Sequence, residues 1–370
     1  MKTTYLLLCL LGIGSVSGAG QTKQPQKIGD FIESTSYNEH RRNATRSLQY
    51  TPDGDDFVCI NGKNRFTRAL YGSHTAFRLE TSDRPVFAAY TKENPKHICF
   101  KLQTSGGTVA LDSTEHCESR YTAGRRSYSL SDPAFGGGSL SITTWALPDK
   151  EGAIWQFNAR NFKEFHPVLL ASISEIRNSK LNRNGDMGAD PADSFEAPLQ
   201  PQQLQSFPVQ IDGTLYILLE NQELRTLTTA EGENLFKKAE AARSETASRI
   251  RIETPDPYFN TLGGTLAMAA DGIWDGEVWL HGAIGWRMPL SGWRAAYTGD
   301  VLGWHDRART HFNAYAASQV TEVPNTLPHP AQDSALHLAR SVKKWGTPQY
   351  SNGYICRNPH RNNQMHHYEH

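Results

Sequence analysis

The sequence predicts an antiparallel β-sandwich that is followed by a helical region, and three observations support this. From about residue 50 to 227, short apolar segments alternate with turn residues and no helical pattern lies between them. Thr228 and Glu231 then have the spacing of a capping box, which begins a polar helix. From Pro257 onward, apolar residues recur at intervals of three and four, as on one face of a helix. The expected order is therefore a sandwich, a linker helix and further helices.

The N-terminal residues predict export. Lys2 precedes a short apolar run over residues 5–13, and the small residues of S-V-S-G-A-G follow it. This is the pattern of a secretory signal peptide, here over residues 1–19, and the run is too short to span a bilayer. We expect a bacterial protein released to the periplasm or the extracellular space, with no membrane association after cleavage. Residues 20–48 are polar and unpatterned, which is typical of a linker.

Charge and cysteine content narrow the partners further. The 370 residues carry 38 Lys and Arg and 38 Asp and Glu, so the formal net charge is zero. Because nucleic-acid-binding domains carry clustered positive charge and membrane surfaces attract charged blocks, we expect neither partner. Four cysteines remain after signal cleavage, which is too few for a disulfide framework. Cys59 and Cys99 lie in V-C-I and I-C-F, and we expect both to be buried.

The sandwich region, residues 49–227, contains seven segments with the composition of short strands. They cover residues 57–60, 66–71, 85–90, 97–102, 139–147, 153–157 and 214–219. Turn residues separate them, among them P-D-G-D at 52–55, N-G at 61–62 and G-G-G at 136–138. The alternation in S-L-S-I-T-T-W-A-L predicts a strand with one buried face.

Two helices are predicted directly after the sandwich. The linker helix, residues 228–250, has only a thin apolar stripe of Leu235, Ala239 and Ala242. The next helix begins with Asp256 as N-cap and Pro257 in the first turn, and it extends to about residue 271. Its expected buried face consists of Phe259, Leu262, Leu266 and Ala269.

Two further helices are predicted beyond it. The first covers residues 293–319 as one continuous helix, with an apolar stripe of Tyr297, Val301, Trp304, Ala308, Phe312 and Tyr315. The second covers residues 333–345 and buries Leu336, Ala339 and Val342.

Five of the eight tryptophans lie between Trp274 and Trp304, interleaved with Asp, Glu, His and Arg. Flat aromatic rings cover the apolar faces of a pyranose, and charged groups hydrogen-bond its hydroxyls. Because a protein core rarely holds so many charges, the stretch favours a site for neutral or acidic sugars.

In this stretch the chain resembles secreted bacterial six-hairpin glycosidases. The motifs are T-P-D-P-Y-F-N and then W-L-H-G-A-I-G-W-R-M-P-L-S-G-W-R-A-A-Y-T-G-D-V-L-G-W-H-D-R-A. More closely, it looks like an uncharacterised polysaccharide-utilisation family that joins an N-terminal sandwich to an (α/α)6 toroid. The resemblance is firmest over residues 250–370 and looser over residues 50–227. It implies a β-supersandwich, a helical linker, a toroid and glycoside hydrolase activity.

The length of the helical region departs from that family pattern. A toroid of twelve helices needs roughly 300 residues at ordinary helix and loop lengths, whereas 115 residues follow Pro255. We therefore expect residues 251–370 to form only the first hairpins of an incomplete toroid, and the chain to be a fragment or a truncated product. A second catalytic carboxylate would then lie outside it.

Glycoside hydrolysis needs two carboxyl groups, one of them protonated. Y-T-G-D at 297–300 resembles the aromatic-x-Gly-Asp step of rhamnosidase-like proteins, whose Asp contacts the sugar, so Asp300 is the first candidate. Glu277, in the loop after the first helix of this region, is the candidate acid. The alternatives are that Asp300 pairs with Arg294 or Arg307, and that Glu277 belongs to a solvated turn.

Further residues are candidates for substrate binding because they flank these carboxylates or line the cleft of a longer relative. They are Trp286, Arg287, Trp293, Arg294, His305, Arg357, His360 and Asn363. For Trp286 and Trp293, core packing is an equal alternative. Trp304 lies on the apolar stripe and is assigned to the core, and Asp306 beside Arg307 is assigned to a local ion pair.

No metal or cofactor is expected. The loop at residues 182–193 resembles a calcium loop, but its glycine falls at the wrong position and its last ligand is not Glu. His366 and His370 have helical spacing but lack the Glu of a zinc hydrolase motif.

The leading hypothesis is an exported glycoside hydrolase-like protein that acts on a complex polysaccharide or oligosaccharide by carboxylate acid–base catalysis. A non-catalytic carbohydrate-binding protein is the first alternative. The second is a polysaccharide lyase, which the order of sandwich before helices disfavours.

Overall fold

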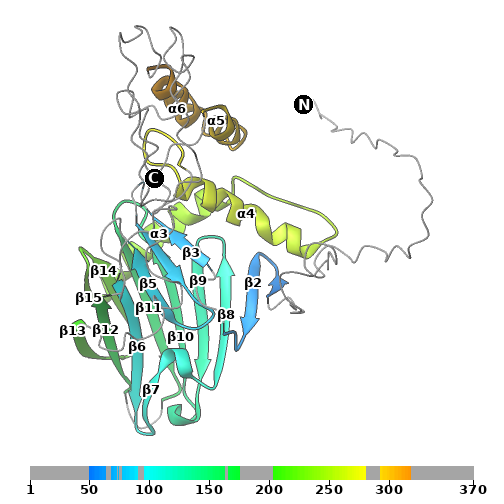
Figure 1. The fold of residues 1–370 in the computed structure, drawn as a ribbon. Helices are drawn as coiled ribbons and strands as arrows, with labels where there is room; N and C mark the ends of the chain where they lie inside the picture. Colours follow the sequence, from blue (N-terminus) through cyan, green and yellow to red (C-terminus); the bar gives the residue numbers. More distant parts are fainter. Residues whose placement is uncertain are drawn as a thin grey trace, which may run out of the picture. The chain divides into compact units, whose positions relative to one another are not determined.

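The computed structural model describes residues 50–63, 68–72, 74, 77–90, 96–162, 166–175, 203–280 and 292–317. Two antiparallel sheets come first and four helices follow in the described part of the chain (Figure 1). The predicted order of a sandwich before helices is therefore confirmed. The predicted signal peptide, the loop at 182–193 and the predicted helix at 333–345 lie outside the described residues.

The larger sheet has eight strands, and all neighbouring pairs are antiparallel. In spatial order they are β1 (Thr51–Asp53), β2 (Asp56–Ile60), β8 (His116–Thr122), β9 (Arg125–Ser131), β10 (Ser139–Ala146), β11 (Gly152–Arg160), β14 (Thr214–Glu220) and β15 (Glu223–Leu227). The chain enters this sheet at one edge and leaves it at the other, directly before the first helix.

The smaller sheet has seven strands. In spatial order they are β13 (Gln203–Gln210), β12 (Val168–Glu175), β6 (Lys96–Thr104), β5 (Val86–Tyr90), β4 (Arg78–Thr81) and β3 (Arg68–Tyr71), and β7 (Gly107–Ala110) also pairs with β6. Two short 3-10 helices, η1 (Leu111–Ser113) and η2 (Pro133–Phe135), lie in the connections.

One hydrophobic core joins the two sheets. Phe87 and Phe100 from the smaller sheet meet Trp155 of the larger sheet edge to face, with ring centroids 5.4 and 5.7 Å from its own. In β10 the alternation has the predicted result, because Leu140 and Ile142 point into this core. Each such pair adds roughly 0.5–1.5 kcal/mol beyond the area it buries.

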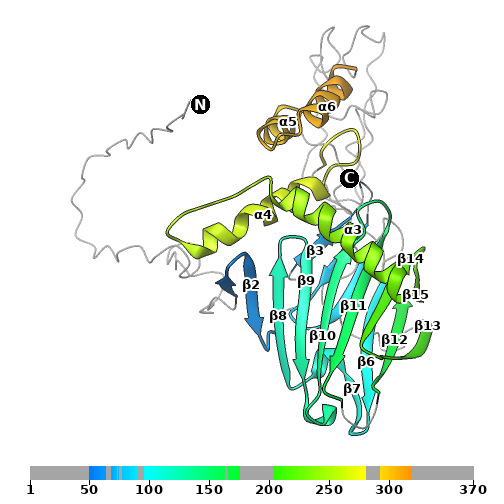
Figure 2. The same cartoon turned by 180° about the vertical axis from the view of Figure 1, so that it is seen from behind.

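The helix after the sandwich, α3 (Thr229–Ala247), covers the outer face of the larger sheet (Figure 2). Its predicted capping box is confirmed: Thr228 accepts from the backbone of Glu231, whose carboxylate accepts from the backbone of Thr228. Phe236 packs against Trp145 with ring centroids 4.0 Å apart. Although the apolar stripe of α3 is thin, the helix packs firmly on the sandwich. The strands beneath it supply the large side chains of this contact.

A carboxylate of α3 ties the helix to the sheet. Glu240 accepts hydrogen bonds from the indole of Trp145 at 2.8 Å and from Arg243 at 2.6 and 2.8 Å. Burial acts to raise the pKa of Glu240, but the hydrogen bonds from Arg243 and Trp145 outweigh it and hold this pKa below its ordinary value.

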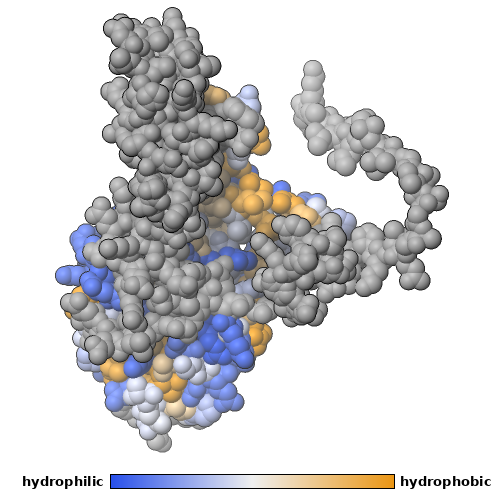
Figure 3. Space-filling view, in the orientation of Figure 1, coloured by the Kyte–Doolittle hydropathy of each residue, from blue (hydrophilic) through white to orange (hydrophobic). Residues whose placement is uncertain are grey.

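The next helix, α4 (Pro257–Gly272), has the predicted cap, with Asp256 accepting from the backbone of Tyr258. Its predicted buried face is only partly correct: Leu262 packs against the core of the sandwich, but Phe259 and Leu266 are 39 and 51 % exposed. Figure 3 shows apolar surface gathered over this part of the chain. The helix instead buries its glycine side: a Cβ on Gly263 would lie 2.8 Å from the backbone oxygen of Ile250. The orientation of α4 thus follows from the close approach of its backbone to that of Ile250, which only glycine permits.

The predicted continuous helix at 293–319 is in fact two helices. They are α5 (Gly292–Val301) and α6 (His305–Ala317), and Gly303 between them has φ +78°. A left-handed glycine is the usual way to end a helix, and here Gly303 donates its N–H to the carbonyl of Asp300 at 2.9 Å. The predicted apolar stripe is divided accordingly: Trp304, Ala308 and Tyr315 are buried, while Tyr297, Val301 and Phe312 are exposed.

The described cysteines and helices bear on two further expectations, the burial of Cys59 and Cys99 and the lack of membrane association. Cys59 and Cys117 are buried and Cys99 is partly buried, and the three are free thiols. Among the described helices, none has the length and apolar character needed to cross a membrane.

Candidate functional site

Three tryptophans of the aromatic stretch form the core of the helical region. Trp274, Trp279 and Trp304 are 5, 2 and 7 % exposed and pack in one cluster. The guanidinium of Arg307 stands 4.6 Å from the centroid of the Trp304 ring. Trp304 was assigned to the core correctly, and Trp274 and Trp279 join it. The rings of Trp274 and Trp279 are therefore not available to cover a sugar, and the ring of Trp304 is only 7 % exposed.

Asp300, the first catalytic candidate, lies near the end of α5 and contacts His305 at the start of α6. Its Oδ1 lies 2.6 Å from Nδ1 of the imidazole, and the two side chains are 59 and 68 % exposed. The expected alternative partners were Arg294 and Arg307, but Arg307 pairs with Asp271 at 2.7 Å. The turn at Gly303 makes the contact possible, because it reverses the chain between the two residues.

The second candidate, Glu277, lies in the loop between α4 and α5. Asp275 accepts hydrogen bonds from the backbone N–H of Glu277 at 3.0 Å and of Val278 at 2.8 Å, so the loop is a tight turn. The side chain of Glu277 is exposed. Glu277 therefore lies in a solvated turn, which was the alternative to a catalytic role. Its carboxylate is still accessible at the surface.

Trp279 connects the elements that carry the two carboxylates. Its ring packs so closely on Gly299 that a Cβ there would lie 2.1 Å from the indole. Gly299 precedes Asp300, and Trp279 follows the turn that holds Glu277. The backbone of Trp279 also donates to Nδ1 of the buried His311 at 3.1 Å. The loop is thus fixed to both α5 and α6.

The other predicted site residues are not brought into this arrangement by the described part of the structure. Trp293 and Arg294 belong to α5, but their side chains are outside the described set. Residues Trp286, Arg287, Arg357, His360 and Asn363 lie outside the described residues altogether. Asp306 makes a local ion pair as expected, although its partner is Arg309 at 3.1 Å.

A cleft that sequence reasoning missed lies where the sandwich meets α3, α4 and α6. Its volume is about 200 Å³, and its lining includes His74, Arg249, Asp271, Trp304 and Arg307. Partial burial lowers the pKa of His74; the charge of Asp271 opposes this effect and that of Arg307 supports it. No motif could have predicted this cleft, because its charged residues come from four separate segments.

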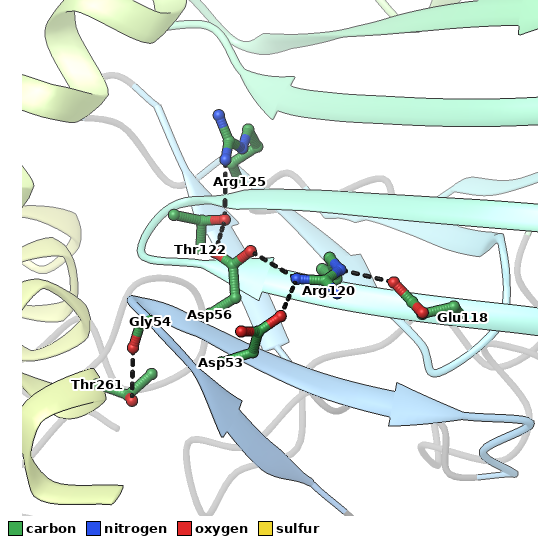
Figure 4. A network of polar contacts seen from close by, with 8 residues as sticks. All are labelled: Asp53, Gly54, Asp56, Glu118, Arg120, Thr122, Arg125 and Thr261. Atoms are coloured by element: carbon green, nitrogen blue, oxygen red, sulfur yellow. Dashed lines mark hydrogen bonds and ion pairs between the residues drawn. The ribbon is translucent and has the colours of Figure 1, made fainter. Parts of the chain in front are cut away.

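A cluster of charged side chains lies at the β1–β2 edge of the larger sheet (Figure 4). Arg120 binds Glu118 at 2.6 Å, Asp53 at 2.8 Å and Asp56 at 3.4 Å. The turn between these strands also accepts a hydrogen bond at Gly54 from Thr261 of α4, at 3.4 Å. The arginine occupies the centre of the carboxylates, so the group stabilises the sheet edge. Among the described residues no cluster of His, Cys, Asp and Glu is suited to a metal ion.

Comparison with known proteins adds one finding. Residues 95–249 match a family model described as a domain of unknown function, DUF4450. The matched part extends from β6 through β15 and α3 and stops before α4. A search among curated proteins found no match to the chain. The matched family therefore covers the larger part of the sandwich, while both candidate carboxylates lie beyond it.

Proposed function

We propose that this protein is an exported, glycoside hydrolase-like protein that acts on a complex polysaccharide, with Asp300 and Glu277 as the acid–base carboxylates. The observation that carries this proposal is the position of Asp300. It is held at the surface by the packing of Gly299 on Trp279, and His305 binds its carboxylate at 2.6 Å. A fixed, exposed carboxylate is accessible to a polymer that is too large to enter a closed pocket.

The chemistry requires one carboxyl group that donates a proton to the leaving oxygen and a second that acts as base or nucleophile. The contact with His305 orients Asp300 and supplies a neighbouring group that can exchange a proton with it. Glu277 lies on the loop that Trp279 fixes to α5. We assign the base or nucleophile role to Asp300 and the acid role to Glu277.

A second candidate function is carbohydrate binding without cleavage. One observation favours it: Asp300 and Glu277 are both exposed. The general acid of a glycosidase usually lies in a buried site or beside a like-charged neighbour, whereas these two carboxylates lie at the surface. Exposed carboxylates also hydrogen-bond sugar hydroxyls well, so the same surface would serve recognition.

The test is a screen of plant and host polysaccharides with the full chain. Cleavage is followed by reducing ends and by the absorbance of unsaturated products, and binding by affinity electrophoresis. Asp300→Asn and Glu277→Gln should lower cleavage on the order of 100-fold or more, as expected for acid–base groups. Asp306→Asn is the matched control, because this aspartate is 94 % exposed and pairs locally with Arg309.

Each outcome decides between the functions. Reducing ends that depend on Asp300 support the hydrolase, and unsaturated products would replace it with a lyase. Binding that is weakened by Asp300→Asn without any cleavage supports the binding protein. If no glycan of the screen is bound or cleaved, both proposals are wrong.

A further inference from the structure

A second cavity, of about 280 Å³, opens at the end of the sandwich between the two sheets. Its apolar wall consists of Phe77, which directly precedes β4, Ala89 of β5 and Leu219 of β14, each less than 5 % exposed. Small-molecule sites in proteins are usually concave, largely apolar and furnished with a few polar groups, with volumes from about 300 Å³. This cavity is slightly smaller than that range, a size that suits a ligand of one sugar residue.

Lys96 places a charge in the cavity wall. The residue is 4 % exposed, and its ammonium lies 3.4 Å from the carboxylate of Glu175, which is 48 % exposed. Removing an ammonium from water is costly, and an apolar residue in such a place is often as stabilising as the ion pair or more so. Lys96 is the first residue of β6, opposite Ala89, where an apolar side chain would complete the core. An ammonium at this position has three N–H donors, so it can donate to a ligand in the cavity as well as to Glu175.

The turn that borders the cavity has a glutamine at a position where glycine is preferred. Glu220 pairs with Glu223, so β14 and β15 are joined by two residues, Asn221 and Gln222, with φ +51° and +66°. Such a turn prefers glycine at its second position, and glutamine rarely adopts a positive φ. Both residues line the cavity. Strained positions of this kind are found where a side chain serves binding, so the strain points to the Gln222 amide.

We infer that this cavity binds the carboxylate-bearing residue of an acidic glycan, a uronate. Lys96 provides the positive charge for the carboxylate, and the amides of Asn221 and Gln222 together with Glu151 provide hydrogen-bond partners for the hydroxyls. The apolar face of the ring lies against Phe77. The inference rests on the proposed carbohydrate function, and it names acidic polysaccharides as the substrate class.

The test measures binding of galacturonate and glucuronate by calorimetry and NMR titration, with galactose, glucose and acetate as comparison ligands. We expect saturable binding of a uronate only. Lys96→Met should weaken it about 10-fold to 100-fold, as for a lost charged hydrogen bond, and Lys96→Arg should retain part of it.

A second variant separates binding from folding. Gln222→Gly should raise the melting temperature, because it relieves the positive φ, and should weaken uronate binding several-fold. Asn161→Gly is the matched control: Asn161 also has a positive φ, +61°, but it follows β11 at the end away from the cavity. It should raise the melting temperature and leave the affinity unchanged.

The inference is overturned by any of three results. They are the absence of saturable uronate binding, equal binding of galactose or acetate, and unchanged affinity in folded Lys96→Met. Because these titrations do not depend on cleavage, they are independent of the Asp300 test. If the protein cleaves or binds a neutral polysaccharide but does not bind uronates, this inference is wrong and the proposed function still holds.

Discussion

The carboxylate of Asp271, near the end of α4, lies 2.7 Å from the guanidinium of Arg307 on α6. The two side chains are only 13 and 23 % exposed, and the same guanidinium stands over the ring of Trp304. One arginine thus joins the helix that packs on the sandwich to the hairpin that carries Asp300. We expect the orientation of the α5–α6 hairpin to depend on this contact.

Arg307→Met should lower the free energy of unfolding by about 1–3 kcal/mol. The substitution keeps an apolar stem against Trp304 but leaves Asp271 as a largely buried carboxylate without its cation. Urea denaturation followed by tryptophan fluorescence measures the effect. Arg309→Met is the control, since Arg309 is 72 % exposed and should change stability by less than about 0.5 kcal/mol. Equal losses in both variants would contradict the role given to Arg307.

Gly299→Ala should destabilise the helical hairpin by about 1–3 kcal/mol, although alanine favours helices, because the new methyl group overlaps Trp279. A Cβ on this residue would lie 2.1 Å from the indole ring. Near-UV circular dichroism should report the displaced tryptophan together with the lower stability. Val301→Ala, at a residue that is 87 % exposed, should leave both unchanged. A gain in stability for Gly299→Ala would refute the close contact.

Glu240→Gln should reduce stability at neutral pH and have no effect in acid. The hydrogen bonds from Arg243 and Trp145 hold the pKa of Glu240 below its ordinary value near 4.5. A carboxyl group whose pKa is lowered by folding stabilises the fold above its unfolded pKa, and this contribution is lost as the pH falls through the folded pKa. The wild-type advantage, about 1–2 kcal/mol at pH 7, should therefore decline below pH 4.5. Thermal unfolding of both proteins across this range is the measurement, and a constant difference would contradict it.

The strands that were predicted from sequence have apolar residues in an uninterrupted run or in regular alternation, although V-L-L-A-S-I-S-E, which has the same character and became β12, was not among them. Segments such as V-F-A-A-Y and S-L-S-I-T-T-W-A-L became β5 and β10. H-C-E-S-R-Y-T and R-R-S-Y-S-L-S, which became β8 and β9, were missed. β9 even turns Arg126 into the interior, where it is 0 % exposed and lies 3.6 Å from the buried Asp83. Its partner is 43 positions away in sequence, so no local pattern could indicate it.

Helix ends were predicted better than helix faces, for a physical reason. A cap is a contact between residues two or three apart, as in Thr228 with Glu231. A buried face depends on what lies opposite, and the glycines of α4 allowed a different side to approach the sandwich.

The candidate site was half predictable. Asp300 was chosen from the resemblance to rhamnosidase-like proteins and Glu277 from its place in the loop after a predicted helix, but a continuous helix would place Asp300 and His305 on different faces. Their contact exists only because Gly303 ends α5. The ion pair between Asp271 and Arg307 joins residues from separate helices, which a spacing argument cannot reach.

The boundary of the DUF4450 match has a consequence for protein fragments. The match begins at residue 95, so it includes β6 and β8 but excludes β5 and β2, their hydrogen-bonded neighbours. A recombinant fragment of residues 95–249 would present two unpaired strand edges and an uncovered core, and such edges promote aggregation. The matched segment therefore contains only part of each sheet. In the whole chain β2 and β5 cover these two edges, so truncation at the matched border should yield insoluble protein.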